Sequence, residues 1–311
     1  MAWLDSRDSK SCWEGGDYVP PFQVYFSRIS KSGQRIGSEI RITDKFEKVY
    51  YPSLLWHHDH YVLFFFAEGA IRYVLLDSQG KSISSYSLLA KPDKKTGIHE
   101  GFEAALGPNG LGISWTVWEE PDGSIDNKYH LSFLEVNPDS GKHSPVTNVD
   151  ENCADDSNCI SDSFFLAPKP ALFWTGKNYG LCWKNNRGEA MVSLFSPSSA
   201  KEVKRFRVLP RKILPGQGPV KVSPSEIKNQ PQIGQPELCA WNGSEIAVIS
   251  TVRIGETEQF AWAKFDESGN QLGNLKYLNT QPCLSWAPQA LNWNGSEYFF
   301  VMNRSLFVIN Q

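Results

Sequence analysis

Three features are missing from the 311-residue sequence, and each absence excludes a class of protein. No apolar run approaches the roughly 18 residues that cross a membrane, and the longest, YVLFFFA, has the length of a buried strand. Lys and Arg are dispersed and the net charge is -3, so we expect no surface for nucleic acid or an anionic membrane. The N-terminus, MAWLDSRDSK, lacks the basic segment and apolar core of a signal peptide, although a mature secreted chain could begin in the same way.

Several catalytic motifs are also missing. The chain has no Gly-x-Ser-x-Gly elbow, no phosphate-binding loop and no HExxH zinc motif. It lacks the Ser-x-Asp-x-Gly-x-x-Trp box of sialidases and the GH…WD signature of WD40 repeats. These absences count against the corresponding enzyme and repeat classes.

What the sequence does contain is short β-rich runs separated by turn residues. Amphipathic helical periodicity is hard to find, aromatic residues make up 13% of the chain, and 24 Gly and 19 Pro are spread along its whole length. This pattern is typical of an all-β protein.

An internal repeat organises these runs. It is a strand ending in Trp, a polar turn and a second apolar strand, as in AWNGSEIAVIS from Ala240, NWNGSEYFFVM from Asn292 and FWTGKNYGLCW from Phe173. LWHHDHYVLFF from Leu55 and ALGPNGLGISW from Ala105 fit the same frame. A second element follows, in which two strands flank a Gly-bearing turn, often Asp-x-x-Gly. That pattern suits a hairpin in which the last residue of the turn needs a positive φ.

Together the two elements form a unit of four antiparallel strands in about 50 residues, which is the size of a propeller blade. The sequence therefore predicts one β-propeller domain over residues 1–311, with six blades. The alternative is five blades, one of them a composite of the two chain ends. The expected blades are approximately 1–49, 50–99, 100–167, 168–234, 235–287 and 288–311.

The Trp-Asn-Gly-Ser-Glu-Tyr repeat, with its Asp-x-x-Gly hairpins, resembles the degenerate propeller repeats of many bacterial extracellular proteins. The resemblance covers nearly the whole chain and implies a propeller fold and an exported location. Propellers host enzymes, lectins and scaffolds alike, so the resemblance does not assign a function.

The segment His57-His58-Asp59-His60 aligns with Asn242-Gly-Ser-Glu, which places it in the turn after the first strand of a blade. A polar turn is the favoured interpretation. The alternative is a metal site in which His57 and His60 meet around one ion.

Alternate connections in an antiparallel blade lie on opposite faces of a propeller. Nearly all of the expected long connections fall on one face, and long loops in compact domains usually carry binding or catalysis. We therefore predict that the functional site lies on this long-loop face. The connections are 5–21, 90–102, 119–127, 147–168, 210–235 and 280–288.

Eight of the 11 Trp fall on the repeat template and are interpreted as packing between blades. Trp13, Trp118 and Trp286 fall in long connections and are the candidate ligand contacts. The polar partners expected beside them are Glu119, Asn186 and Arg187.

Carboxylates near the start of the inner strands suggest an enzyme as an alternative. Glu103 and Glu237, helped by Glu100 or His99, could act as an acid and a base on a glycan, or could hold a cation. Paired carboxylates that cleave glycosidic bonds stand roughly 5 to 9.5 Å apart. A solvated channel mouth is the favoured interpretation of these residues.

Six Cys are present without the spacing of a zinc site. The spacing suggests a Cys153–Cys159 bridge and, between the two ends of a closed ring, a Cys12–Cys283 bridge. Cys182 and Cys239 are either buried thiols or a pair between blades. Bridges would indicate an oxidising compartment, whereas six reduced thiols would fit a cytoplasmic protein.

The segment DENCADDSNCISD is rich in carboxylates, and Asp155, Asp156 and Asp162 are weak candidates for a Ca²⁺ site. It lacks EF-hand spacing, so a solvated loop is favoured and no cofactor is expected.

Three functions remain in competition. The leading one is a non-enzymatic module that binds a carbohydrate or protein ligand on the long-loop face. The others are a glycan-active enzyme and a structural subunit of a larger assembly, the last of which predicts an exposed apolar patch.

Overall fold

The computed structural model describes residues 1–5, 22–44, 46, 49–91, 96–119, 128–149, 171–184, 190–209, 232–254, 257–278, 290–293, 295–302 and 305–309. All regular elements within these ranges are β-strands, and they form six separate antiparallel sheets. We number the sheets in chain order.

The first sheet has three strands and the next two have four each. The first contains β1 (Ala2–Asp5), β2 (Gln23–Ile29) and β3 (Arg35–Arg41). The second contains β4 (Val49–His57), β5 (His60–Ala67), β6 (Ala70–Leu76) and β7 (Ser87–Ala90). The third contains β8 (Thr96–Leu106), β9 (Leu111–Glu119), β10 (Lys128–Val136) and β11 (Thr147–Asn148).

The fourth and fifth sheets have four strands and the last has three. The fourth contains β12 (Ala171–Trp174), β13 (Tyr179–Lys184), β14 (Ala190–Phe195) and β15 (Glu202–Leu209). The fifth contains β16 (Gln232–Trp241), β17 (Ile246–Ile254), β18 (Thr257–Phe265) and β19 (Lys276–Leu278). The sixth contains β20 (Ala290–Trp293), β21 (Tyr298–Met302) and β22 (Ser305–Ile309).

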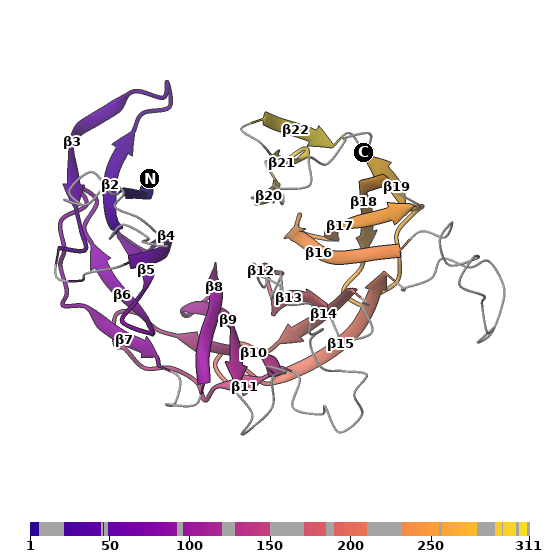
Figure 1. Ribbon diagram of the computed structural model, residues 1–311, viewed down its shortest axis with the longest axis horizontal. Helices are drawn as coiled ribbons and strands as arrows, with labels where there is room; N and C mark the ends of the chain where they lie inside the picture. The colour runs from indigo at the N-terminus through magenta and orange to yellow at the C-terminus, as the bar shows by residue number, and fades with distance from the viewer. Residues whose placement is uncertain are drawn as a thin grey trace, which may run out of the picture.

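Figure 1 shows the six sheets following one another around an arc, with β4, β8, β12, β16 and β20 on its inner side and β7, β11, β15 and β19 on its outer side. The predicted all-β propeller is therefore confirmed. Among the described strands, none of the first sheet pairs with one of the sixth, so the described sheets are six and include no composite blade.

The two recurrent turns have the geometry that the sequence predicts. In the first hairpin of the fifth sheet, the Asn242 carboxamide oxygen accepts hydrogen bonds from the backbone N–H groups of Ser244 (2.9 Å) and Glu245 (2.8 Å). In the Asp-x-x-Gly turn, the Asp77 carboxylate accepts the N–H groups of Gln79 (2.8 Å) and Lys81 (2.9 Å), and Gly80 has a φ of 88°. Such Asx interactions fix a turn locally, which is why the turns could be predicted from sequence.

The hydrophobic core lies between successive sheets. The buried apolar residues of the described chain fall into five clusters, and each cluster combines side chains from two neighbouring sheets. One face of each blade is therefore buried against the next blade, as in other propellers.

The Trp and Tyr of the repeat have a role within each hairpin. Trp56, Trp174 and Trp293 pack against Tyr61, Tyr179 and Tyr298 of their own sheets, with ring centroids 4.6, 4.8 and 4.7 Å apart. Aromatic pairs at such distances stabilise the fold beyond the burial of their area. The interpretation of Trp56 as inter-blade packing was wrong, because its ring contacts Tyr61 of the same hairpin and the residue is 44% exposed.

Several strands begin or end beyond the predicted limits. β8 starts at Thr96, so the connection predicted for 90–102 is shorter, and a register shift interrupts the β8–β9 ladder between His99 and Phe102. β16 starts at Gln232 within the predicted connection 210–235. The inner strands are therefore longer than the repeat template suggests.

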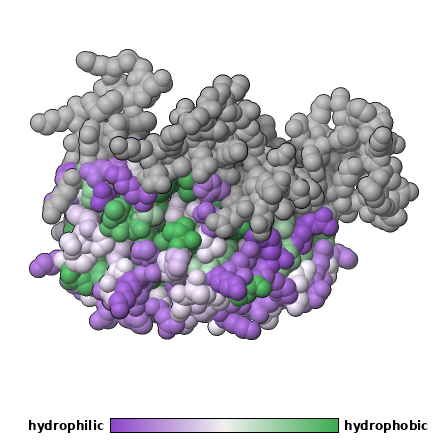
Figure 2. All heavy atoms as spheres, turned by 90° about the horizontal axis from the view of Figure 1, so that it is seen from below, coloured by the Kyte–Doolittle hydropathy of each residue, from purple (hydrophilic) through white to green (hydrophobic). Residues whose placement is uncertain are grey.

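The described surface visible in Figure 2 is mostly polar, with apolar residues in several small patches. Exposed apolar side chains such as Trp56, Ile83 and Leu88 come from different strands and turns. Within the described part of the chain, no helix is long and apolar enough to cross a bilayer.

Candidate functional site

The described strands are of unequal length. The longest second and third strands extend toward the side of the propeller that carries the predicted long connections. Leu111, Tyr179, Ile246 and Tyr298 begin the second strands of their sheets, and each pairs with the last residue of the inner strand. From this common start β9 and β17 run for nine residues, β13 for six and β21 for five. At about 3.3 Å per residue, β9 and β17 extend about 10 Å beyond β13.

The third strands extend in the same way, since β10 and β18 have nine residues and β14 has six. The extended β9–β10 and β17–β18 hairpins thus belong to the sheets on either side of the fourth sheet. We call them the projecting hairpins. They lie on the side from which the chain segments 120–127, 149–170 and 210–231 leave the sheets.

The structure changes the placement of one predicted ligand contact. Trp118 and Glu119 are not loop residues, because they are the last two residues of β9 and pair with Tyr129 and Lys128 of β10. They therefore lie at the described end of a projecting hairpin on the predicted face, and their side chains are outside the described part. Trp13, Trp286, Asn186 and Arg187 lie outside the described residues.

The predicted carboxylates belong to two inner strands. Glu103 is half-buried in β8 opposite Ser114, His99 and Glu100 lie in the same strand at the register shift, and Glu237 lies in β16. The side chains of His99, Glu100 and Glu237 are outside the described part, so the separation of the paired carboxylates stays a prediction.

One cysteine pair is a disulfide. Cys182 of β13 and Cys239 of β16 are bonded across the fourth and fifth sheets, with Cα atoms 6.4 Å apart. Of the two alternatives, the structure shows the inter-blade pair. The predicted Cys153–Cys159 and Cys12–Cys283 bridges, and the Ca²⁺ candidates Asp155, Asp156 and Asp162, lie outside the described residues.

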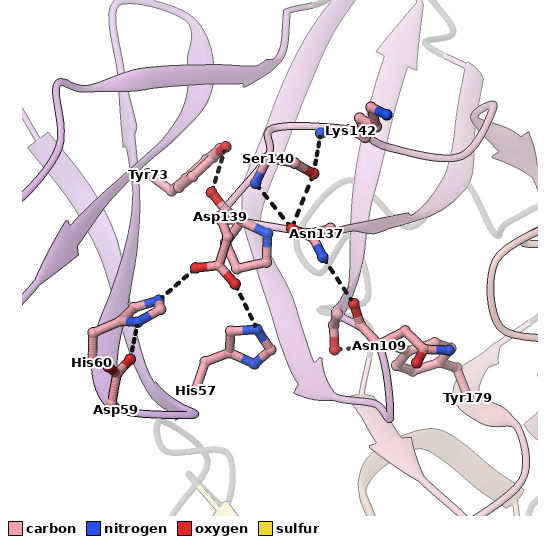
Figure 3. Close-up of polar contacts among 12 residues, drawn as sticks. His57, Asp59, His60, Tyr73, Asn109, Asn137, Asp139, Ser140, Lys142 and Tyr179 are labelled. Carbon is pink, nitrogen blue, oxygen red and sulfur yellow. Dashed lines mark hydrogen bonds and ion pairs between the residues drawn. The ribbon is translucent and has the colours of Figure 1, made fainter.

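A second polar site lies on the side of the short turns, between the second and third sheets (Figure 3). It contains His57 and His60 at the ends of the β4–β5 turn, and Asp139 from the β10–β11 connection. His58, within the turn, belongs to the same group. The polar turn predicted for the histidines is confirmed, since residues 58–59 connect β4 to β5. We call these four residues, with Asp59, the His/Asp cluster.

The Asp139 carboxylate faces two buried imidazoles. Its Oδ2 lies 3.7 Å from His57 Nε2, and its Oδ1 lies 3.3 Å from His60 Nε2. His57 and His60 are only 4% and 6% exposed, whereas His58 and Asp139 are exposed. Neither Nε2 atom makes a well-aligned hydrogen bond.

Electrostatics keep His57 neutral near pH 7. Burial lowers its pKa, the neighbouring His58 lowers it further, and Asp139 acts in the opposite direction. The hydrogen bond between His60 Nδ1 and Asp59 Oδ1, at 2.9 Å, lowers the pKa of Asp59. A neutral imidazole nitrogen is the form that binds a metal ion.

Sequence reasoning missed Asp139, which stands in the NPDSGK turn of another repeat. The propeller interpretation placed both turns on the same face of successive blades. No local signal indicated that this carboxylate would point toward the histidines.

No family model matches the sequence, and no curated protein matches it. Solved structures similar to it include a luciferin-regenerating enzyme, with 10% identity and a TM-score of 0.45 over 90% of this chain and 75% of that one. The Dos1 propeller has 9% identity and a TM-score of 0.42 over 90% and 70% of the two chains. A glycosyl hydrolase from Bacteroides ovatus has 9% identity and a TM-score of 0.40 over 91% and 87%. These likenesses concern the fold alone.

Proposed function

We propose that the protein is a non-enzymatic binding module that presents its long-loop face to a carbohydrate or protein ligand. The observation that supports this proposal most directly is the pair of projecting hairpins. β9–β10 and β17–β18 extend about 10 Å past the described strands β13 and β14 of the fourth sheet, on the side where the long connections leave the strands.

Hydrogen-bonded strands position side chains more accurately than loops do. Trp118 and Glu119 end β9 with backbone partners on both sides, since Trp118 pairs with Gly97 of β8 and Tyr129 of β10. A tryptophan carried by a paired strand suits a sugar, which offers an apolar face to an aromatic ring. It equally suits a protein interface as an aromatic anchor.

We further propose that the protein matures outside the cytoplasm. The Cys182–Cys239 bridge supports this, because disulfides persist mainly in oxidising compartments. The resemblance of the W-N-G-x-x-Y repeat to the repeats of bacterial extracellular propellers supports the same location.

Replacing Trp118 with alanine should weaken ligand binding roughly 30-fold, which is the effect of removing an aromatic hot spot. The measurement is binding of the full chain to a broad glycan array, followed by titration of the best ligand. The matched control is Trp56→Ala, since Trp56 is an exposed tryptophan at the opposite end of a hairpin.

Equal loss in the two variants, or full binding by Trp118→Ala, would contradict the proposed site. If the folded wild type binds no glycan, the same pair of variants should be compared in pull-downs of protein partners. Glycan hydrolysis that Glu103→Gln abolishes would instead favour the enzyme.

A further inference from the structure

We propose that the His/Asp cluster is a binding site for one divalent transition-metal ion, most suitably Zn²⁺, which joins the second and third sheets. The ligands are His57, His58 and the Asp139 carboxylate. This site is separate from the proposed ligand-binding face and does not depend on it.

The geometry brings three ligand atoms to one place. One nitrogen of His57, one of His58 and one carboxylate oxygen of Asp139 all lie within 4.8 Å of one another. Zinc binds nitrogen and oxygen at about 2.0–2.2 Å, so ligand atoms in a tetrahedral site stand about 3.3 Å apart. Small side-chain rotations would close this difference, and both His58 and Asp139 are exposed. Among the described residues, this is the one group of three such side chains within that range.

The buried nitrogens provide a second and independent observation. His57 Nε2 faces Asp139 at 3.7 Å and has no hydrogen-bond partner, although the residue is only 4% exposed. An unpaired buried polar atom costs about 1–3 kcal/mol. A bound cation between the nitrogen and the carboxylate would remove this cost.

His60 provides another buried ring nitrogen that faces the Asp139 carboxylate without a hydrogen-bond partner. Asp59 only accepts hydrogen bonds when it is ionised, so the His60 Nδ1 must carry the proton in the 2.9 Å contact. In a neutral ring the other nitrogen, Nε2, then has a lone pair that faces the Asp139 oxygen at 3.3 Å. Two acceptors in contact repel each other, and a cation bound to the Asp139 carboxylate would reduce this repulsion.

The cluster also contains residues that would contact the metal ligands rather than the metal itself. His60 stands between Asp59 and Asp139 (Figure 3), so it lies beside the carboxylate ligand without being one of the three. Two imidazoles and one carboxylate suit Zn²⁺ more than Ca²⁺ or Mg²⁺, which prefer oxygen ligands only. Three protein ligands leave one position of a tetrahedral ion for water or another group.

The test uses the full chain, freed of metal with a chelator and titrated with Zn²⁺ by calorimetry at pH 7.5. We expect one equivalent to bind, and saturating Zn²⁺ to raise the Tm, because a ligand of the native state stabilises it. His58→Ala and Asp139→Ala should each weaken binding roughly 100-fold or more and abolish the Tm shift. Both side chains are exposed, so these variants should fold.

Asp59→Ala should weaken binding roughly 10-fold, as expected for loss of an outer contact. The matched control is His143→Ala, because His143 is an exposed histidine of the same β10–β11 connection outside the cluster. It should bind as the wild type does. No binding by the wild type, or equal binding by the His58→Ala, Asp139→Ala double variant, would overturn the proposal. The second result would assign the ion to other residues.

Discussion

Replacing both Cys182 and Cys239 with alanine should lower the free energy of unfolding by about 4 kcal/mol. The bond joins residues 57 positions apart, and a crosslink of that span removes much of the conformational entropy of the unfolded chain. It also joins β13 to β16, so its loss removes the covalent link between two neighbouring sheets. Urea unfolding followed by tryptophan fluorescence measures the effect, with the buried Trp183 next to Cys182 as a reporter.

Reducing agent supplies the control for this prediction. In reducing buffer the wild type should unfold at nearly the same urea concentration as the double variant. If the two proteins already agree in non-reducing buffer, the bridge does not stabilise the protein. A difference that survives reduction would instead come from altered packing around the two side chains.

The second large effect is expected at Glu135, a buried carboxylate between the third and fourth sheets. Its Oε1 accepts the Tyr179 hydroxyl at 2.8 Å, and its Oε2 accepts the backbone N–H of Ser198. Burial and the adjacent carboxylate raise the pKa of Tyr179 well above its usual value, so the phenol stays protonated and donates. Glu135 is 6% exposed, so water does not replace it readily.

Glu135→Ala should therefore destabilise the protein by about 2 kcal/mol, because it removes the charged acceptor of the buried Tyr179 hydroxyl and leaves it only the more distant Gly110 carbonyl oxygen, at 3.3 Å. The measurement is again urea unfolding. The control is Glu68→Ala, which removes an exposed ion pair with Arg72 (2.7 Å) and should cost less than about 1 kcal/mol. Equal losses in the two variants would contradict the role assigned to burial.

These two sites belong to a wider pattern, in which four of the five junctions between successive described sheets carry different specific contacts. The fourth and fifth sheets share the disulfide, and the third and fourth share Glu135 and Tyr179. At the last junction Trp262 packs on Tyr298 with ring centroids 4.8 Å apart. The second and third sheets share the His/Asp cluster. The sheets therefore resemble one another in their strands and turns, whereas the contacts between sheets differ from one junction to the next.

The order and type of the elements could be predicted from the sequence because their causes are local. Alternating apolar residues select strands, and turn residues such as Asn242 and Asp77 make hydrogen bonds to backbone groups two to four positions ahead. A period of about 50 residues then implies a propeller. The polar turn at His57–His60 followed from the same alignment.

The side-chain contacts between neighbouring sheets could not be predicted in this way. The pairing of Cys182 with Cys239 stayed open, and Asp139 was not associated with His57, because both contacts join different repeats. The prediction that Trp118 lies in a loop was wrong for a related reason. β9 continues past the predicted end of its repeat because it pairs with β10 on one side and β8 on the other.

The sequence by itself thus determined the blades, their order and the turns that close them. Only the tertiary structure decided which side chains meet between blades, how far the hairpins project and where buried nitrogens face a carboxylate. The physical reason is that hairpins form from contacts between near neighbours in the chain. Packing between blades depends on the exact offset and tilt of two sheets, and no short segment encodes these.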